Sequence, residues 1–204
     1  MEQQALWKYK SRRNDVSLMQ TDQGRFVVKT FSEEDSFQKE LHIYRLLQDK
    51  DIPCAKVIKT SDKTLVLSEL PGQNLVKCLE AQEQMGLPDW EIWEKLVTWL
   101  TEFYLQTGFV MTDVNLRNFL YDEKSKTLYG LDFEQCSCGS MAVSAASVAA
   151  FIRTYKPENT PLKQEISSYI LALFARNCEI EVESLFLETA RQETKILVRR
   201  KNKK

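Results

Sequence analysis

Histidine, glycine and long apolar runs are all scarce in this chain. Its 204 residues include a single histidine, His42, and six glycines. No apolar run approaches the ~20 residues that a membrane-spanning helix requires. The N-terminal stretch Glu2-Gln3-Gln4 is polar and acidic, unlike the start of a secretory signal peptide. We therefore expect a cytoplasmic protein without a transmembrane segment.

Cysteines are odd in number and widely spaced, a pattern that does not suggest a disulfide framework. The five are Cys54, Cys78, Cys136, Cys138 and Cys178. With no signal peptide, they indicate reduced thiols in a cytoplasm. Cys136 and Cys138 resemble half of a zinc site, but such a site needs a second pair or histidines, and His42 lies on an expected helix. Zinc binding is therefore not favoured.

Positive charge gathers at the C-terminus of the chain. The formal net charge is −1, yet residues 195–204 contain six Lys or Arg and no acid. The remaining residues therefore carry a net negative charge, which argues against nucleic-acid binding by the fold itself. The basic tail is either a solvated helix end or a contact for a protein partner, for RNA or for anionic lipid.

The pattern of elements changes after residue 70. Before that point, apolar patterns and turn signals predict strands and one helix, at 5–31, 32–49, 56–58 and 64–70. Pro71-Gly72 then breaks the chain. After the break, the patterns predict a hairpin at 119–131 and helices at 90–107, 142–155, 162–177 and 181–200. We expect an α+β fold with a β-rich part, 1–70, and a mostly helical part, 71–204.

Lys29 lies in the apolar run 27–31, where a lysine is expected to be half buried. A buried ammonium needs a partner, and Glu40 on the following helix is the candidate. On a helical wheel Glu40 falls inside the apolar stripe that contains Phe37 and Tyr44. The two residues either form a buried ion pair, or Lys29 faces solvent on an edge strand while Glu40 extends outward.

Three polar residues stand at the edges of apolar runs: Asp113, Asn118 and Asp132. Asp113 opens a loop, Asn118 closes it, and Asp132 ends the expected hairpin. Antiparallel strands return to where they began, so the hairpin is expected to bring Asn118 beside Asp132. Phosphoryl transfer needs one carboxylate to orient a hydroxyl and two oxygen ligands for Mg²⁺. The alternative is that each is a turn residue with local hydrogen bonds.

The order of these motifs resembles the protein kinase-like superfamily over nearly the whole chain. It comprises a lysine in a strand, a glutamate in the next helix, a Pro-Gly break, a long helix, Asp-x₄-Asn and Asp-Phe. Leu131-Asp132-Phe133-Glu134 looks like the aminoglycoside phosphotransferase and choline kinase branch, and 67–72 is similar to its connection between lobes. The short second part is similar to the compact Bud32, RIO and lipopolysaccharide-kinase types. The resemblance implies a two-lobed kinase-like fold.

The same resemblance implies that ATP binds between the lobes. Lys29 would contact the α- and β-phosphates and pair with Glu40. The backbone of Glu69 and Leu70 would meet the adenine. Together with Arg12 and Arg13 of the preceding segment, these four residues form the expected nucleotide-binding set.

On the acceptor side, the resemblance implies roles for the loop residues. Asp113 would accept or orient the substrate hydroxyl, while Asn118 and Asp132 would hold Mg²⁺. Arg117 would steady the transferring phosphate, or it is an ordinary surface arginine. These residues form the expected catalytic and metal-binding set.

One segment departs from the superfamily. Kinases of this fold usually cover the phosphates with a glycine-rich loop, whereas residues 10–15 contain no glycine. Arg12 and Arg13 would supply charge there instead, or would block the site. The segment therefore weakens the resemblance where the phosphates would bind.

Two functions are consistent with these observations. The first is an ATP- and Mg²⁺-dependent phosphotransferase that acts on a hydroxyl of a small molecule or of a sugar or lipid head group. The second is a pseudokinase or a Bud32-like ATPase that serves as a nucleotide-binding partner module. Residues 136–204 hold no cluster of acids for a polycationic aminoglycoside. An antibiotic kinase is therefore not favoured.

Overall fold

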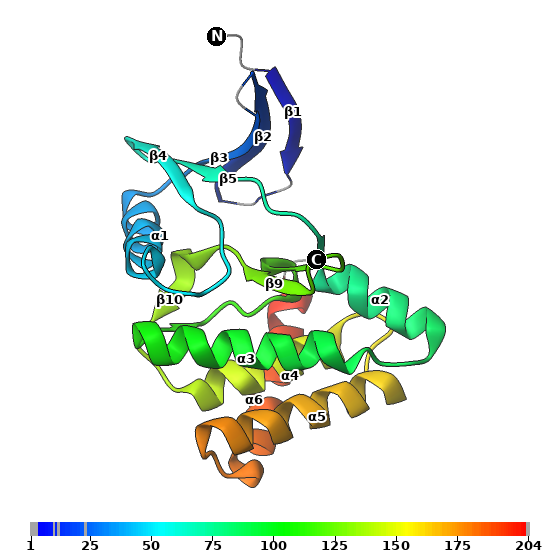
Figure 1. The fold of residues 1–204 in the computed structure, drawn as a ribbon. Coiled ribbons are helices and arrows are strands. Elements are labelled where there is room, and N and C mark those ends of the chain that lie inside the picture. Colours follow the sequence, from blue (N-terminus) through cyan, green and yellow to red (C-terminus); the bar gives the residue numbers. More distant parts are fainter. Residues whose placement is uncertain (1–3, 10, 12, 23, 203–204) are drawn as a thin grey trace.

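A computed structural model describes residues 4–9, 11, 13–22 and 24–202. The residues up to 70 are called the first half of the fold below, and the residues after 70 the second half. In the first half, an antiparallel sheet has the strand order β1-β2-β3-β5-β4. Its strands are β1 (Gln4–Tyr9), β2 (Asp15–Thr21), β3 (Gly24–Thr30), β4 (Val57–Ser61) and β5 (Thr64–Ser68). In Figure 1 this sheet lies above the helices of the second half.

Helix α1 (Glu34–Leu47) connects β3 to β4 and lies beside the sheet (Figure 1). Its buried residues are Phe37, Glu40, Leu41, Ile43, Tyr44 and Leu47. They recur at helical spacing, so one face packs inward while the opposite face stays polar. Glu40 is the single acidic residue on that inward face, which is why it needs a cationic partner.

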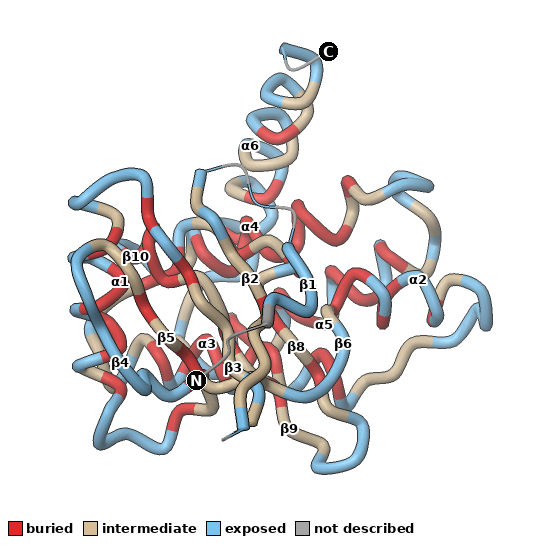
Figure 2. Tube along the Cα trace, turned by 90° about the horizontal axis from the view of Figure 1, so that it is seen from above, coloured by how far each residue is buried: buried red, intermediate tan, exposed pale blue. Residues whose placement is uncertain are grey.

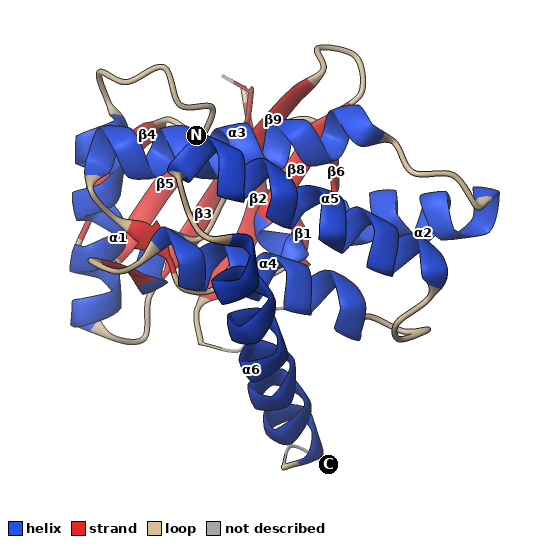
Figure 3. Ribbon diagram, turned by 90° about the horizontal axis from the view of Figure 1, so that it is seen from below, coloured by secondary structure: helices blue, strands red, loops and turns tan. Residues whose placement is uncertain are grey.

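Helices form most of the second half. They are α2 (Leu75–Met85), α3 (Trp90–Thr107), α4 (Met141–Thr154), α5 (Pro161–Cys178) and α6 (Val182–Lys201). Gly86 and Gly108 end α2 and α3 in the left-handed conformation that glycine adopts without strain. Seen from below, α3, α4 and α5 lie under the sheet, and α6 extends away from them (Figure 3).

Four short strands between α3 and α4 flank the central loops, and a fifth, β6, precedes α2. Strand β8 (Phe119–Asp122) pairs with β9 (Thr127–Gly130) and with β6 (Gln73–Asn74). Strand β7 (Val110–Met111) pairs with β10 (Cys136–Ser137). The loop that contains Asp113 runs from β7 to β8, and the loop that contains Asp132 runs from β9 to β10. The two strand pairs therefore hold both loops at both ends.

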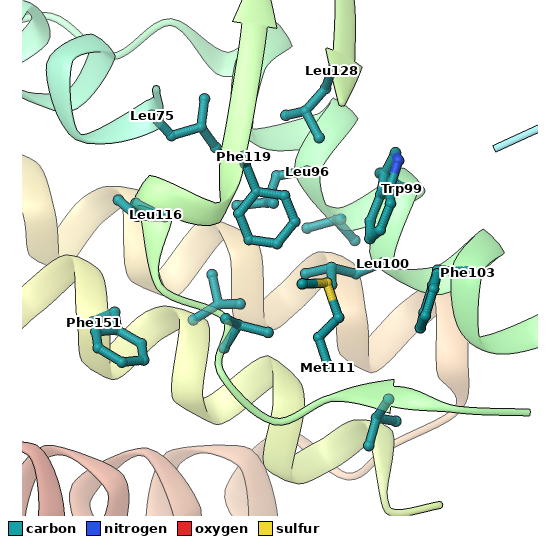
Figure 4. Close-up of a cluster of buried hydrophobic side chains, with 14 of the residues drawn as sticks. Leu75, Leu96, Trp99, Leu100, Phe103, Met111, Leu116, Phe119, Leu128 and Phe151 are labelled. Atoms are coloured by element: carbon teal, nitrogen blue, oxygen red, sulfur yellow. The ribbon is translucent and has the colours of Figure 1, made fainter. Parts of the chain in front are cut away.

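Buried side chains pack around the segment between Met111 and Phe119, among them Trp99, Leu100 and Phe103 of α3 (Figure 4). The rings of Trp99 and Phe103 on α3 stack with Phe133, at centroid distances of 6.2 and 5.8 Å. Phe133 is fully buried, so its position is fixed by close packing. Because Asp132 directly precedes Phe133, this packing also fixes the backbone of Asp132.

The predicted α+β fold is confirmed, with a sheet-containing N-terminal region and a helical C-terminal region. A division into lobes after residue 70 stays a proposal. No helix in the described part of the chain has the length and apolar character needed to cross a bilayer.

Candidate active site

Lys29 and Glu40 form a buried ion pair. Lys29 Nζ donates to Glu40 Oε2 at 2.6 Å, and the two side chains are 8% and 1% exposed. Strand β3 lies between β2 and β5, so Lys29 is on a central strand and not on an edge. This geometry excludes the alternative in which both charges face solvent.

Asp132 gives Lys29 a second partner. Lys29 Nζ also donates to Asp132 Oδ1 at 2.6 Å. Burial lowers the pKa of Lys29, but the carboxylates of Glu40 and Asp132 outweigh burial, and the pKa is raised above 10.5. Burial raises the pKa of Glu40 to about 7, against the pull of the Lys29 ammonium. We take Lys29 as charged, because it bonds two carboxylates at once.

The hairpin brings the predicted loop residues together. Phe119 on β8 pairs with Gly130 on β9, and the Leu131 N–H donates to the Asn118 carbonyl at 2.8 Å. Asn118 Nδ2 in turn donates to the backbone carbonyl of Asp113 at 2.9 Å. The side-chain NH₂ of Asn118 is thus engaged with the loop, and its amide oxygen is the atom that a metal could use.

Asp113 is partly buried at the start of this loop. Burial raises the pKa of its carboxyl above the usual value, while the Arg199 guanidinium opposes the shift. A carboxylate with a raised pKa accepts a proton more readily, which suits a group that takes a proton from a hydroxyl.

Oxygen ligands for a divalent cation gather around Asp132. Carboxylate oxygens of Glu40, Asp132 and Glu134 lie within 4.8 Å of one another. Carboxylate and amide oxygens are the donors that Mg²⁺ prefers. Glu40, Asp132 and Glu134 therefore offer oxygens of the kind that this metal takes, and Asn118 lines the same cavity. Glu134 is a member of this group that the sequence analysis did not select.

Glu134 also holds the glycine-free segment between β1 and β2. Asn14 Nδ2 donates to Glu134 Oε2 at 2.6 Å, and Arg13 Nη1 lies 3.5 Å from Glu134 Oε1. Arg12 lies outside the described residues. Side-chain bonds to a buried carboxylate thus position this segment. The signal was available in the sequence as the Glu that follows Asp-Phe.

A cavity of about 740 Å³ joins these groups. It is lined by every predicted site residue that the structure describes: Arg13, Lys29, Glu40, Glu69, Leu70, Asp113, Arg117, Asn118 and Asp132. Glu69 forms an ion pair with Arg25, in which Arg25 Nη2 lies 2.6 Å from Glu69 Oε1. This pair lies beside the backbone connection to the second half. Residues from both halves of the chain therefore face one common space.

Residues 31–164 match the family model of the ABC1 atypical kinase-like domain, which is more than half of the chain. The chain belongs to the ABC1 atypical kinase-like family. Membership of the protein kinase-like superfamily is thus confirmed. The ABC1 family was not among the branches that the sequence motifs had suggested.

A solved structure supports the fold of this ABC1-type domain. The kinase PK-1 of Cydia pomonella granulovirus aligns with a TM-score of 0.55 and 20% sequence identity. The alignment covers 67% of this chain and 55% of the viral kinase, so the chain spans little more than half of that protein. No curated protein matches the chain in sequence.

Three residues that the sequence analysis did not place in the site, Asn115, Arg199 and Arg200, also line the cavity. Asn115 Oδ1 accepts from the Tyr155 hydroxyl at 2.7 Å and from the Arg117 N–H at 3.0 Å. Arg199 and Arg200 of α6 line the cavity as well. No local sequence pattern indicates the bond between Asn115 and Tyr155. Arg199 and Arg200 were assigned from the sequence only to the basic tail.

Proposed function

We propose that this protein is a phosphotransferase that uses ATP and Mg²⁺ and phosphorylates a hydroxyl of a small molecule or of a sugar or lipid head group. The observation that carries the proposal is the convergence of Asp113, Asn118 and Asp132 with the Lys29–Glu40 pair on one cavity. Membership of a kinase-like family supports phosphoryl transfer as the type of reaction.

In the proposed reaction the acceptor oxygen attacks the γ-phosphorus of ATP. A new P–O bond forms, and the bond from the γ-phosphorus to the β,γ-bridging oxygen breaks. ADP leaves with that electron pair, and the hydroxyl proton passes to Asp113. Lys29, held by Glu40, would balance charge on the α- and β-phosphates.

Asn118 and Asp132, with Glu134, are the residues that would hold Mg²⁺. The metal would neutralise phosphate charge and orient the phosphates for in-line attack. The backbone of Glu69 and Leu70 would meet the adenine. The proposal places the reaction in the cytoplasm, where free thiols such as Cys54 and Cys136 stay reduced.

A thermal-shift titration with ATP, with and without Mg²⁺, tests the proposal. A ligand that binds the folded state at ten times its dissociation constant stabilises by about 1.4 kcal/mol, which is a midpoint rise of about 3–6 °C. We expect this rise for the wild type with Mg²⁺, and a much smaller one for Asp132→Ala. Asp51→Ala, an exposed loop variant, serves as the control and keeps the full rise.

No midpoint rise of the wild type at millimolar Mg·ATP would overturn the proposal. The second candidate is a pseudokinase or Bud32-like ATPase that acts as a nucleotide-binding partner module. A rise that depends neither on Mg²⁺ nor on Asp132 favours its pseudokinase form, because an ATPase would still need Mg²⁺ on the phosphates. The glycine-free segment around Arg13, fixed to Glu134, is the observation that favours this candidate.

A further inference from the structure

Helix α6 carries the basic end of the chain to the cavity. Its inward face, Leu185, Thr189 and Ile196, is buried. An ion pair of 3.3 Å between Arg153 and Glu193 ties it to the end of α4. The last turns of α6 stand out from the body and are mostly exposed (Figures 2 and 3). At this end, Arg199 and Arg200 line the cavity.

Tyr155, directly after α4, is the point where two guanidinium groups meet. The guanidinium carbon of Arg200 lies 5.8 Å from the centroid of the Tyr155 ring, and that of Arg117 lies 6.0 Å from it. Arg200 Nη1 also donates to the carbonyl of Thr154, at the C-terminal end of α4, where the helix dipole favours a cation. The Tyr155 hydroxyl is fixed in turn by Asn115. Two arginines from distant segments are therefore positioned around one ring.

None of these arginines forms an ion pair with a carboxylate of the described residues. Among the described residues, no carboxylate lies within 4.0 Å of Arg117, Arg199 or Arg200, whereas Arg25 and Arg153 each have one. These three arginines line a cavity whose carboxylates at Glu40, Asp132 and Glu134 are already bonded to Lys29 or Asn14. A concentration of unpaired guanidinium groups in a cavity favours an anionic ligand.

The three arginines lie on the acceptor side of the site. Arg117 belongs to the loop between Asp113 and Asn118, and Arg199 is the cation with the largest effect on the pKa of Asp113. The charges that shift the pKa of Lys29 are instead those of Glu40 and Asp132. The charges that shift the pKa of Glu40 are those of Lys29, Asp132 and Glu134. Lys29 is thus bonded to Glu40 and Asp132, whereas Arg117 and Arg200 lie around Tyr155 next to the Asp113 loop.

We propose that Arg117, Arg199 and Arg200 form a subsite for a phosphate group of the acceptor. The planar guanidinium fork matches phosphate oxygens and makes bidentate hydrogen bonds to them. The acceptor is then an alcohol that already carries a phosphomonoester, either a soluble phosphorylated polyol or sugar, or a lipid head group. The identity of this group as an acceptor rests on the proposed phosphotransferase function, whereas the anion site itself does not.

Phosphate binding by full-length variants tests the subsite, with Mg·ADP present to occupy the nucleotide side. Arg199→Gln/Arg200→Gln removes two charges of the subsite. Its matched control, Lys195→Gln/Lys201→Gln, removes two exposed charges of the same helix that do not line the cavity. Arg117→Gln removes a charge of the subsite without touching α6, so that a fold defect of α6 cannot decide the result.

Two probes distinguish the sources of phosphate. The first is inorganic phosphate, followed by titration calorimetry. The second is a set of phosphatidylcholine vesicles with and without phosphatidic acid, followed by co-sedimentation. We expect the wild type to bind at least one of the two, and the dissociation constant to rise about 10- to 100-fold in both arginine variants. The lysine variant is expected to stay within about twofold, since exposed charges are screened.

Equal binding by all variants, or no binding by the wild type to either probe, would overturn the subsite. Mg·ATP thermal shifts are recorded in parallel, because they report on the nucleotide side alone. Arginine-dependent phosphate binding without a Mg·ATP shift supports the subsite and removes the proposed function. A Mg·ATP shift together with phosphate binding that does not depend on the arginines supports the proposed function and removes the subsite.

Discussion

At the scale of single residues, the Lys29–Glu40 pair explains how a charge is tolerated inside the sheet. A buried ammonium is costly unless it is both paired and hydrogen-bonded. Lys29 meets this requirement twice, through Glu40 and Asp132. The pair was predictable because Glu40 interrupts an apolar stripe. The Asn115–Tyr155 bond was not, because nothing local to either residue signals a contact 40 positions away.

We predict that Glu40→Gln lowers the free energy of unfolding by about 2–4 kcal/mol, because Lys29 is left buried with only the more exposed Asp132 as its anion. Urea denaturation provides the measurement. Asp35→Asn, which breaks the exposed Asp35–Lys39 pair on the same helix, is the control and is expected to cost little. Equal losses in the two variants would contradict a special role for the buried pair.

At the scale of elements, periodicity predicted the helices well where the apolar face is long. Helix α3 has the predicted bounds, 90–107, because its apolar face repeats over the whole length and Gly108 ends it. Helix α2 was not singled out, although Asn74 caps it and Gly86 ends it. Its shorter face gives fewer repeats, so the capping residues carried most of the available signal.

Gly72 fixes how the sheet connects to the second half. It has φ +102, and an added Cβ is 2.4 Å from the backbone oxygen of Tyr121 on β8. We predict that Gly72→Ala costs roughly 3 kcal/mol or more of stability, since both a strained φ and a backbone clash are introduced. Differential scanning calorimetry measures the loss.

The control for Gly72→Ala is Gly86→Ala. Gly86 also has a positive φ, +69, but no atom lies within 4 Å of an added Cβ. This change is expected to cost only about 1 kcal/mol, from the backbone conformation alone. A similar cost at the two positions would show that the approach of Gly72 to β8 is not tight.

At the scale of the whole molecule, contacts across the cavity join the two halves of the chain. Lys29 bonds to Asp132, and Asn14 and Arg13 bond to Glu134. Sequence motifs predicted which residues would meet at Asp113 and Asp132, because their order along the chain is that of a known superfamily. They did not predict that α6 returns Arg199 to the same cavity, since this follows from packing against α4 and not from a local pattern.

Glu134→Ala removes the carboxylate that anchors the segment between β1 and β2. We predict faster amide hydrogen exchange over residues 13–21, because side-chain bonds to Glu134 hold this segment in place. Hydrogen-exchange mass spectrometry measures the effect. Glu123→Ala, in the exposed turn between β8 and β9, is the control. Unchanged exchange in Glu134→Ala would show that the strands alone fix the segment.

The position of Arg199 and Arg200 in the last turn of α6 has a quantitative consequence for the affinity of the proposed phosphate subsite. Terminal turns open locally at little cost in free energy. If only a fraction of molecules has the last turn of α6 docked on Tyr155, the apparent dissociation constant of the acceptor is the intrinsic one divided by that fraction. A change in the docked population would then change the affinity of the proposed phosphate subsite, while the bonds of Lys29 to Glu40 and Asp132 stay as they are.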